Sequence, residues 1–278
     1  MAVRKRVFEL LSHHLTMSLN VKSIFAWYLL AASLPCLVLA EKHEVLPSPL
    51  QSSSQLIVVT TPDWNAVDGQ LQLYQRTSSS GPWQTLGAPI HIVVGKGGMA
   101  WGIGVMPMHR SGDPIKQEGD LKSPAGIFRL GSAFGYAPQE PEGWKMRYTP
   151  LTPSTDCVDD PQSRFYNQIL DSSTVAVDWK SAEHMRDAGD AYRWGLVIDH
   201  NADSPKPRGG SCVFMHLWGG AGHGTAGCTA MPEPQVKSIL AWLDPQAHPL
   251  LVQMPLHQYQ QAETSLHLPT LPPAITRP

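Results

Sequence analysis

Glycine and proline interrupt this sequence so often that long helices have little room to form. The 278 residues include 23 glycines and 25 prolines, and the apolar runs between them are short. These runs read as strands separated by turns, among them residues 56–60, 90–94, 127–130, 194–201 and 211–218. The clearest helix is "PEPQVKSILAWLDP" at 232–245, with proline at its start and apolar residues on one face. The pattern predicts a mainly β chain with a few short helices.

The first 40 residues have the order of an export signal. A basic segment precedes the apolar residues 24–40, and the polar "EKHE" follows. Val38 and Ala40 fit the positions before a cleavage site, so we expect cleavage after Ala40. An uncleaved N-terminal anchor is the alternative, because the apolar run is close to the length of a membrane span. Either way, the protein is expected to be exported, to the periplasm or cell envelope.

Composition sets the domain organisation. Residues 41–54 read as a polar linker, residues 55–254 as one domain, and the proline-rich residues 255–278 as a disordered tail. Apolar residues make up 42% of the chain and charged residues 16%, which suits a sizeable core. The net charge of −2 and the lack of a basic stripe give nucleic-acid binding no support.

The stretch "SCVFMHLWGGAGHGTAGCTAM" at 211–231 concentrates the reactive side chains. It holds Cys212, His216, His223 and Cys228, which are residue types used by zinc sites, disulfides and catalytic dyads. "SCVFMHLW" alternates like a strand, and four strand residues span roughly 13 Å. One zinc ion with bonds of about 2.0–2.3 Å cannot take ligands so far apart. We therefore expect no metal.

The cysteines suggest one disulfide and one spare thiol. Removal of residues 1–40 leaves Cys157, Cys212 and Cys228, an odd number in an oxidising compartment. Cys157 and Cys212 both lie in turn regions and are the favoured pair, although sequence alone does not fix the connectivity. Cys228 remains as the candidate thiol.

Cys228 follows glycine in "GTAGCTAM", a setting suited to nucleophilic catalysis. Gly227 allows a ligand to approach the backbone, and its N–H could help form an oxyanion hole. An imidazole near the thiol would lower the pKa of Cys228. His216 is the favoured base because a strand holds it rigidly, whereas His223 lies among loop glycines. His223, Thr225 and Trp218 are candidates for contact with substrate.

Several segments resemble the L,D-transpeptidase (YkuD-like) catalytic domain over about residues 55–254. "HLWGGAGHGTAGCTAM" is similar to the family signature, in which a histidine precedes a Ser/Thr-x-Gly-Cys element. "EGDLKSPAGIFRL" resembles its Gly-x-x-x-Thr-Pro-x-Gly segment, with Ser123 where threonine is commoner. The stretches "DDPQSRFYN", "AEHM", "VIDHN" and "GSCVFMHLW" look like a single-domain branch of the family.

The resemblance implies a β-sandwich-like catalytic domain that acts on peptidoglycan stem tetrapeptides. Cys228 would attack the carbonyl of the third stem residue, D-alanine would leave, and an amine or water would resolve the thioester. His216 would be the general acid/base, and the N–H groups of Gly227 and Cys228 would bind the oxyanion. No cofactor is expected, and the protein is expected to be a monomer.

The sequence also departs from the commoner family pattern. Ala226 stands where the family more often has histidine, and no arginine follows two residues after Cys228. These changes leave nucleophile and base in place but remove two side chains that suit substrate recognition. Two alternatives to the transferase stay open: a hydrolase (L,D-carboxypeptidase or amidase) on the same scaffold, and a catalytically silent wall-binding protein in which Cys212 and Cys228 are bonded to each other.

Overall fold

The structure is a computed structural model that describes residues 49–78 and 80–272. The predicted signal peptide or anchor at 1–40 and most of the predicted linker lie outside the described residues. No helix among the described residues is long and apolar enough to cross a bilayer.

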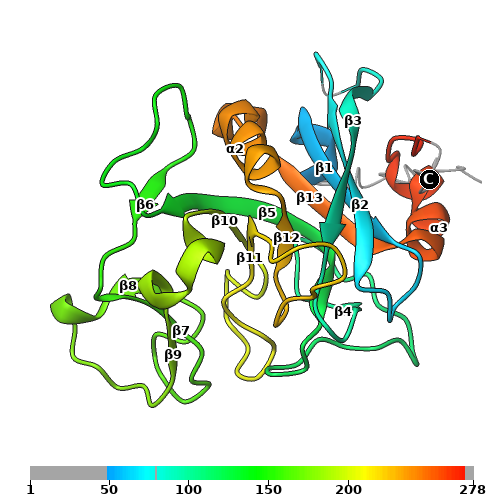
Figure 1. Cartoon of the computed structure of the whole chain (residues 1–278). Helices are drawn as coiled ribbons and strands as arrows, with labels where there is room; N and C mark the ends of the chain where they lie inside the picture. The colour runs from blue at the N-terminus through cyan, green and yellow to red at the C-terminus, as the bar shows by residue number, and fades with distance from the viewer. Residues whose placement is uncertain (1–48, 79, 273–278) are drawn as a thin grey trace, which may run out of the picture. The chain divides into compact units, whose positions relative to one another are not determined.

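Thirteen strands form the described part of the chain, with short helices between or after them (Figure 1). The strands are β1 (Gln55–Thr61), β2 (Asp68–Gln75), β3 (Gln84–Val93), β4 (Met99–Trp101), β5 (Ser123–Gly135), β6 (Tyr148–Pro150), β7 (Thr155–Val158), β8 (Ile169–Asp171), β9 (Ala182–His184), β10 (Trp194–Ile198), β11 (Phe214–Leu217), β12 (Thr229–Met231) and β13 (Leu250–Pro255). The α-helices are α1 (Pro49–Ser52), α2 (Glu233–Trp242) and α3 (Leu256–Leu266), and short 3₁₀ helices lie at Ser172–Thr174, Met185–Asp187, Gly189–Tyr192 and Pro245–Ala247. The prediction of a mainly β chain with few helices is confirmed.

The main sheet closes on itself. Its strand order runs β10-β11-β12-β3-β2-β1-β13-β5, and β5 also pairs with β10 at the far end of this series. The long β5 makes the closure possible, because Gly126–Arg129 pair with β13 while Leu130–Gly135 pair with β10. The result is a barrel-like sheet, whereas the sequence analysis expected a sandwich-like arrangement.

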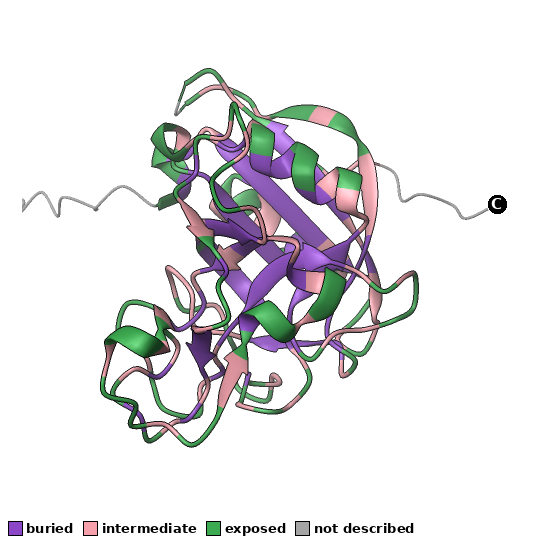
Figure 2. Ribbon diagram, turned by 60° about the vertical axis from the view of Figure 1, so that its left-hand side comes forward, coloured by how far each residue is buried: buried purple, intermediate pink, exposed green. Residues whose placement is uncertain are grey.

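The core lies between the strands of this sheet and the helices that cover it (Figure 2). Leu56, Ile57 and Leu71 are fully buried, the first two within the continuous apolar run of β1, which is buried on both faces. α2 packs against β10 and β11 through Val236 and Ile239, confirming the helix that the sequence predicts. A second, smaller cluster of buried residues lies on the other side of β11 and includes Cys157, Tyr192, Cys212, Phe214 and Cys228.

The predicted disordered tail is wrong for residues 255–272. Residues 256–266 form α3, which packs against β1 and β13. Tyr259 is fully buried, and its hydroxyl donates to the carbonyl of Pro269 at 2.6 Å. Leu268 is also buried. The many polar residues of this segment lie on its exposed side. Few apolar residues are enough to anchor the helix, so the composition of the segment does not indicate that it is folded.

The predicted linker is also partly structured. Residues 49–52 form α1, and Leu50 is buried against the core. The guanidinium of Arg76 donates to the carbonyls of Leu50, Gln51 and Ser53. The folded domain therefore extends from at least residue 49 to residue 272, beyond the predicted bounds of 55 and 254.

Candidate functional site

The two residues proposed as nucleophile and base lie on neighbouring parallel strands. His216 is in β11 and pairs with Ala230 of β12, while Cys228 immediately precedes β12. Because Met215 pairs with Thr229, Cys228 lies one position back, beside Phe214. Paired residues and residues two positions apart share a face of a sheet. His216 and Cys228 therefore lie on the same face, diagonal to each other.

Side-chain hydroxyls fix the main chain at Cys228. The hydroxyls of Ser123 and Thr225 both donate to the Cys228 carbonyl, at 2.9 and 2.6 Å. The Ser123 hydroxyl in turn accepts from the Gly95 N–H at 2.9 Å. The serine of "KSPAG" thus links the start of β5 to the backbone of Cys228, a role that threonine in the same place would also allow.

The backbone conformation at position 227 requires glycine. The predicted role of the Gly227 N–H as an oxyanion donor does not fit this structure. Its φ of +153° lies in the region that favours glycine, and a Cβ there would come within 3.1 Å of the Lys122 carbonyl. However, the Gly227 N–H donates to the Thr225 hydroxyl at 3.0 Å. This N–H is therefore already hydrogen-bonded, and the Thr225 hydroxyl holds the backbone of residues 227–228 in place.

The Cys228 thiol is enclosed by main-chain groups. The Phe214 N–H donates to Sγ at 3.3 Å, and the thiol donates to the Cys212 carbonyl at 3.7 Å. Only 6% of the residue is exposed. Burial, with the nearby Glu183 carboxyl, raises the pKa of Cys228 to about 12. The thiol is therefore protonated at neutral pH, and no thiolate–imidazolium pair exists in this state.

The His216 ring has a defined orientation. Its Nδ1 lies 2.7 Å from the carbonyl of Leu217, and because a carbonyl only accepts, Nδ1 carries the proton. Nε2 then holds a lone pair and can accept a proton. Burial lowers the pKa of His216 to about 4, so the ring is neutral at pH 7. No hydrogen bond joins His216 to Cys228 in the described part of the chain.

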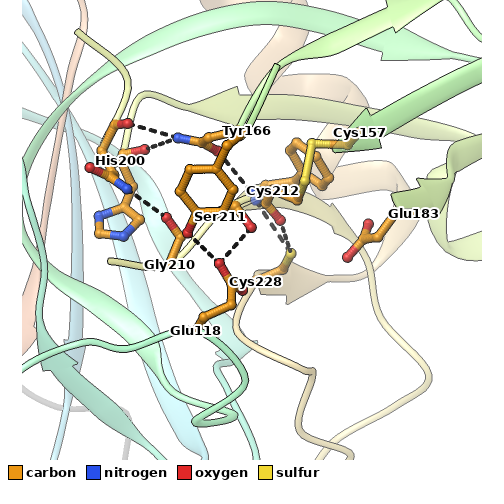
Figure 3. Close-up of a disulfide and its surroundings, with 12 residues drawn as sticks. Glu118, Cys157, Tyr166, Glu183, His200, Gly210, Ser211, Cys212 and Cys228 are labelled. Carbon is orange, nitrogen blue, oxygen red and sulfur yellow. Dashed lines mark hydrogen bonds between the residues drawn. A yellow bond between two sulfur atoms is a disulfide. The ribbon is translucent and has the colours of Figure 1, made fainter. Parts of the chain in front are cut away.

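Two residues that the sequence analysis did not assign lie against the thiol. The Tyr192 hydroxyl donates to a carboxylate oxygen of Glu183 at 2.7 Å, and Tyr192 packs in the same buried cluster as Cys228. Figure 3 shows Glu183 beside the Cys228 sulfur. The Tyr192 ring packs edge-on against His216, with centroids 5.2 Å apart. Tyr192 therefore packs near Cys228 and against the imidazole of His216.

Cys157 and Cys212 form the disulfide that the sequence analysis favoured, and Cys228 is free (Figure 3). The Asn167 side chain accepts from the Cys212 N–H at 2.9 Å and donates to the carbonyls of His200 and Asn201. These bonds hold the disulfide segment against the thiol. Because Cys212 is bonded to Cys157, it can neither bond to Cys228 nor supply a thiolate to a metal.

A pocket of about 310 Å³ opens beside His216. Trp218, His223 and Thr225, the three candidates for substrate contact, all line it, and so does Tyr192. Cys228 is not among the lining residues, so the thiol is not open to the pocket in this structure. Nothing in the local sequence marks Tyr192 as a neighbour of Cys228. Glu183 could have been considered, because it lies in the "AEHM" segment that resembles the family.

Comparisons with known proteins do not identify a family for this chain. No family model matches the chain, and no curated protein matches it. A search of solved structures finds the helical cell shape determining protein Pgp2 from Campylobacter jejuni, with 13% sequence identity and a TM-score of 0.34. The match covers 73% of this chain and 48% of that one, so this chain spans about half the length of Pgp2. A TM-score this low carries no argument about fold or function.

Proposed function

We propose that the protein is an exported cysteine acyltransferase of the L,D-transpeptidase (YkuD-like) type, which acts on peptidoglycan stem tetrapeptides. Cys228 is the nucleophile and His216 is the general acid/base. The observation that carries the proposal is the free thiol of Cys228 on the same strand-pair face as a histidine whose Nε2 lone pair is left available. The disulfide supports export, because such bonds persist mainly in oxidising compartments.

The chemistry begins from a neutral pair. The Cys228 thiol transfers its proton to His216 Nε2 as sulfur attacks the carbonyl of the third stem residue. The tetrahedral intermediate collapses, the C–N bond to D-alanine breaks, and the imidazolium returns the proton to the leaving amine. An acceptor amine then attacks the thioester, loses its proton to His216, and releases the protonated thiol. Water in place of the amine gives hydrolysis.

The resting geometry requires a closing movement before the first step. His216 and Cys228 are not hydrogen-bonded, and Cys228 does not line the pocket, whereas Tyr192 lines it and packs in the same buried cluster as Cys228. Catalytic hydrogen bonds often tighten only when substrate is bound. Substrate entering the pocket would displace the Tyr192 side chain and bring the imidazole within reach of the thiol.

Incubation with purified disaccharide tetrapeptides, followed by mass spectrometry of the products, tests the proposal. Cross-linked dimers that lack one D-alanine are the expected product, and Cys228→Ala should form none. Shortened monomers without dimers would instead support the hydrolase alternative. Unchanged substrate, with Cys228 shown to be reduced and the chain folded, would contradict the enzyme proposal and support a wall-binding role.

A further inference from the structure

A second, larger cavity lies on the other side of the loop that follows β11. It has a volume of about 800 Å³ and runs between the outer face of β1–β3 and helix α3, and we name it the β2–α3 cleft. This volume lies within the range of small-ligand sites, which is about 300–1,000 Å³. In Figure 1, α3 lies alongside β2 at this edge of the molecule.

The lining of the β2–α3 cleft combines amides, hydroxyls and carboxylates on an apolar base. Its hydrogen-bonding side chains include Gln70, Gln260, Thr60, Thr270, Asp68 and Glu263. No lysine or arginine is among the lining residues that the structure describes. Amides and hydroxyls both donate and accept, while carboxylates only accept. The cleft therefore suits a ligand without negative charge that is rich in hydroxyl and amide groups.

One buried polar atom in the lining has no partner. Gln72 lines the β2–α3 cleft and is 3% exposed, and its side-chain N–H groups donate to the carbonyls of Leu73, Leu86 and Gly87. Its Oε1 has no hydrogen-bond partner. Buried side-chain oxygens are usually satisfied. An N–H or O–H donor on a ligand would supply the missing bond after a small adjustment of the amide.

The β2–α3 cleft and the thiol share one face of the sheet. One row of paired residues crosses four neighbouring strands: Asp68, Val93, Ala230 and His216. Directly paired residues point to the same side. Two contacts join the cleft to the loop that follows β11 and lines the pocket beside His216: Asp68 accepts from the Gly222 N–H at 3.1 Å, and the rings of His91 and Trp218 lie 5.2 Å apart.

The separation of the two sites matches the length of a stem peptide. Neighbouring strands are about 4.8 Å apart, so β12, which begins just after Cys228, lies roughly 10 Å from β2, where the β2–α3 cleft begins. Three extended residues also span about 10 Å. With the third residue of a stem peptide at Cys228, the sugar that carries the stem would reach the Asp68 end of the cleft.

We infer that the β2–α3 cleft binds the uncharged, N-acetylated sugar chain of the substrate, while the stem peptide extends from it to Cys228. This inference rests on the proposed function for the identity of the sugar.

Titration of the full-length chain with the neutral tetrasaccharide of N-acetylglucosamine, followed by calorimetry, tests the inference. The variant Gln70→Ala/Gln260→Ala removes two amides from the β2–α3 cleft, and Gln261→Ala is the matched control on the next residue of α3, outside the lining. We expect saturable binding by the wild type and by Gln261→Ala, and at least tenfold weaker binding by the double variant. Thermal unfolding of each variant shows that the fold is kept.

Absence of saturable binding, or equal binding by the double variant, would overturn the inference. Displacement of the tetrasaccharide by the free stem tetrapeptide would also overturn it, because the cleft would then hold peptide. Acylation of Cys228 by soluble peptide is measured separately. Sugar binding without acylation contradicts the proposed function alone, and acylation without sugar binding contradicts only the role of the cleft.

Discussion

His216 and His223 differ in how the chain holds them, although both lie within twelve residues of Cys228. His216 is 8% exposed and its ring is fixed by the Leu217 carbonyl on a strand. His223 lies in an exposed loop, and its ring contacts the Ala221 carbonyl at 3.2 Å. Proton transfer needs a side chain held within about 0.5 Å of its working position. Of the two rings, only that of His216 is both buried and carried by a strand.

The two histidines therefore form a matched pair of variants. His216→Ala should lower product formation at least 10²-fold, the usual minimum contribution of a general base. His223→Ala should change it by less than about threefold. Rates of dimer formation from disaccharide tetrapeptides measure both, and strong loss in His223→Ala with normal activity in His216→Ala would reverse the assignment of the base.

Tyr192 provides a second test among the residues of the candidate site. Its removal should expose the thiol, because Tyr192 lines the pocket and packs in the same buried cluster as Cys228. Tyr192→Ala should speed alkylation of Cys228 by iodoacetamide at least tenfold at pH 8, measured by peptide mapping. Tyr148→Ala, a change of the same size away from the thiol, is the control. Equal alkylation rates would show that Tyr192 does not cover Cys228.

The sequence predicts some residues of the candidate site and misses others. Cys228 and His216 were identified because glycine before the cysteine and strand alternation around the histidine are local patterns. Tyr192 and Glu183 lie 36 and 45 positions before Cys228 and reach it only through tertiary packing. The engaged N–H of Gly227 was also beyond prediction, since it depends on the rotamer of Thr225.

At the scale of elements, the disulfide joins β7 to the residue two positions before β11. It closes a loop with a sequence separation of 55. In the chain-entropy description, a loop of that size contributes about 4 kcal/mol to the free energy of unfolding. Cys157→Ser/Cys212→Ser should therefore lower stability by about 2–4 kcal/mol in urea unfolding. A change below about 0.5 kcal/mol would mean that the disulfide leaves the unfolded chain essentially unconstrained.

Helix α3 gives the other prediction at this scale. Tyr259 is fully buried, so Tyr259→Ala should lower the free energy of unfolding by about 3–5 kcal/mol. Gln261→Ala, on the exposed side of the same helix, should change it by less than about 0.5 kcal/mol. Urea unfolding compares the two. Similar values for both variants would support the disordered tail that composition alone suggested.

For the whole described domain, two buried histidines link stability to pH. Burial lowers the pKa of both His216 and His200 to about 4, whereas an unfolded histidine titrates near 6.5. Between these values the unfolded chain binds more protons than the folded one, so stability falls as pH decreases from 6.5 towards 4. Each histidine contributes up to about 1.4 kcal/mol per pH unit in that window.

Urea unfolding at several pH values between 7 and 4.5 measures this dependence. His216→Ala should have a smaller slope of stability against pH than the wild type. A wild-type slope in His216→Ala would mean that His216 titrates normally in the folded protein.

Closure of the main sheet could not be predicted from the sequence. The strands β1, β3, β10 and β11 were recognised from local apolar patterns, but β5 pairs with distant segments: Gly135 pairs with Trp194 of β10, 59 positions later, and Arg129 pairs with Leu250 of β13, 121 positions later. Local patterns carry no information about such partners. The β2–α3 cleft was missed for the same reason, since it exists only once α3 packs beside the sheet.

Incubation with a carbapenem, followed by intact-mass and peptide mass spectrometry, tests the central claim most directly. The claim is that the Cys228 thiol is acylated with His216 as its base. The account predicts one covalent carbapenem adduct on Cys228 in the wild type, strongly slowed formation in His216→Ala, and none in Cys228→Ala. A folded wild-type protein that forms no adduct, or forms it equally fast without His216, would contradict it.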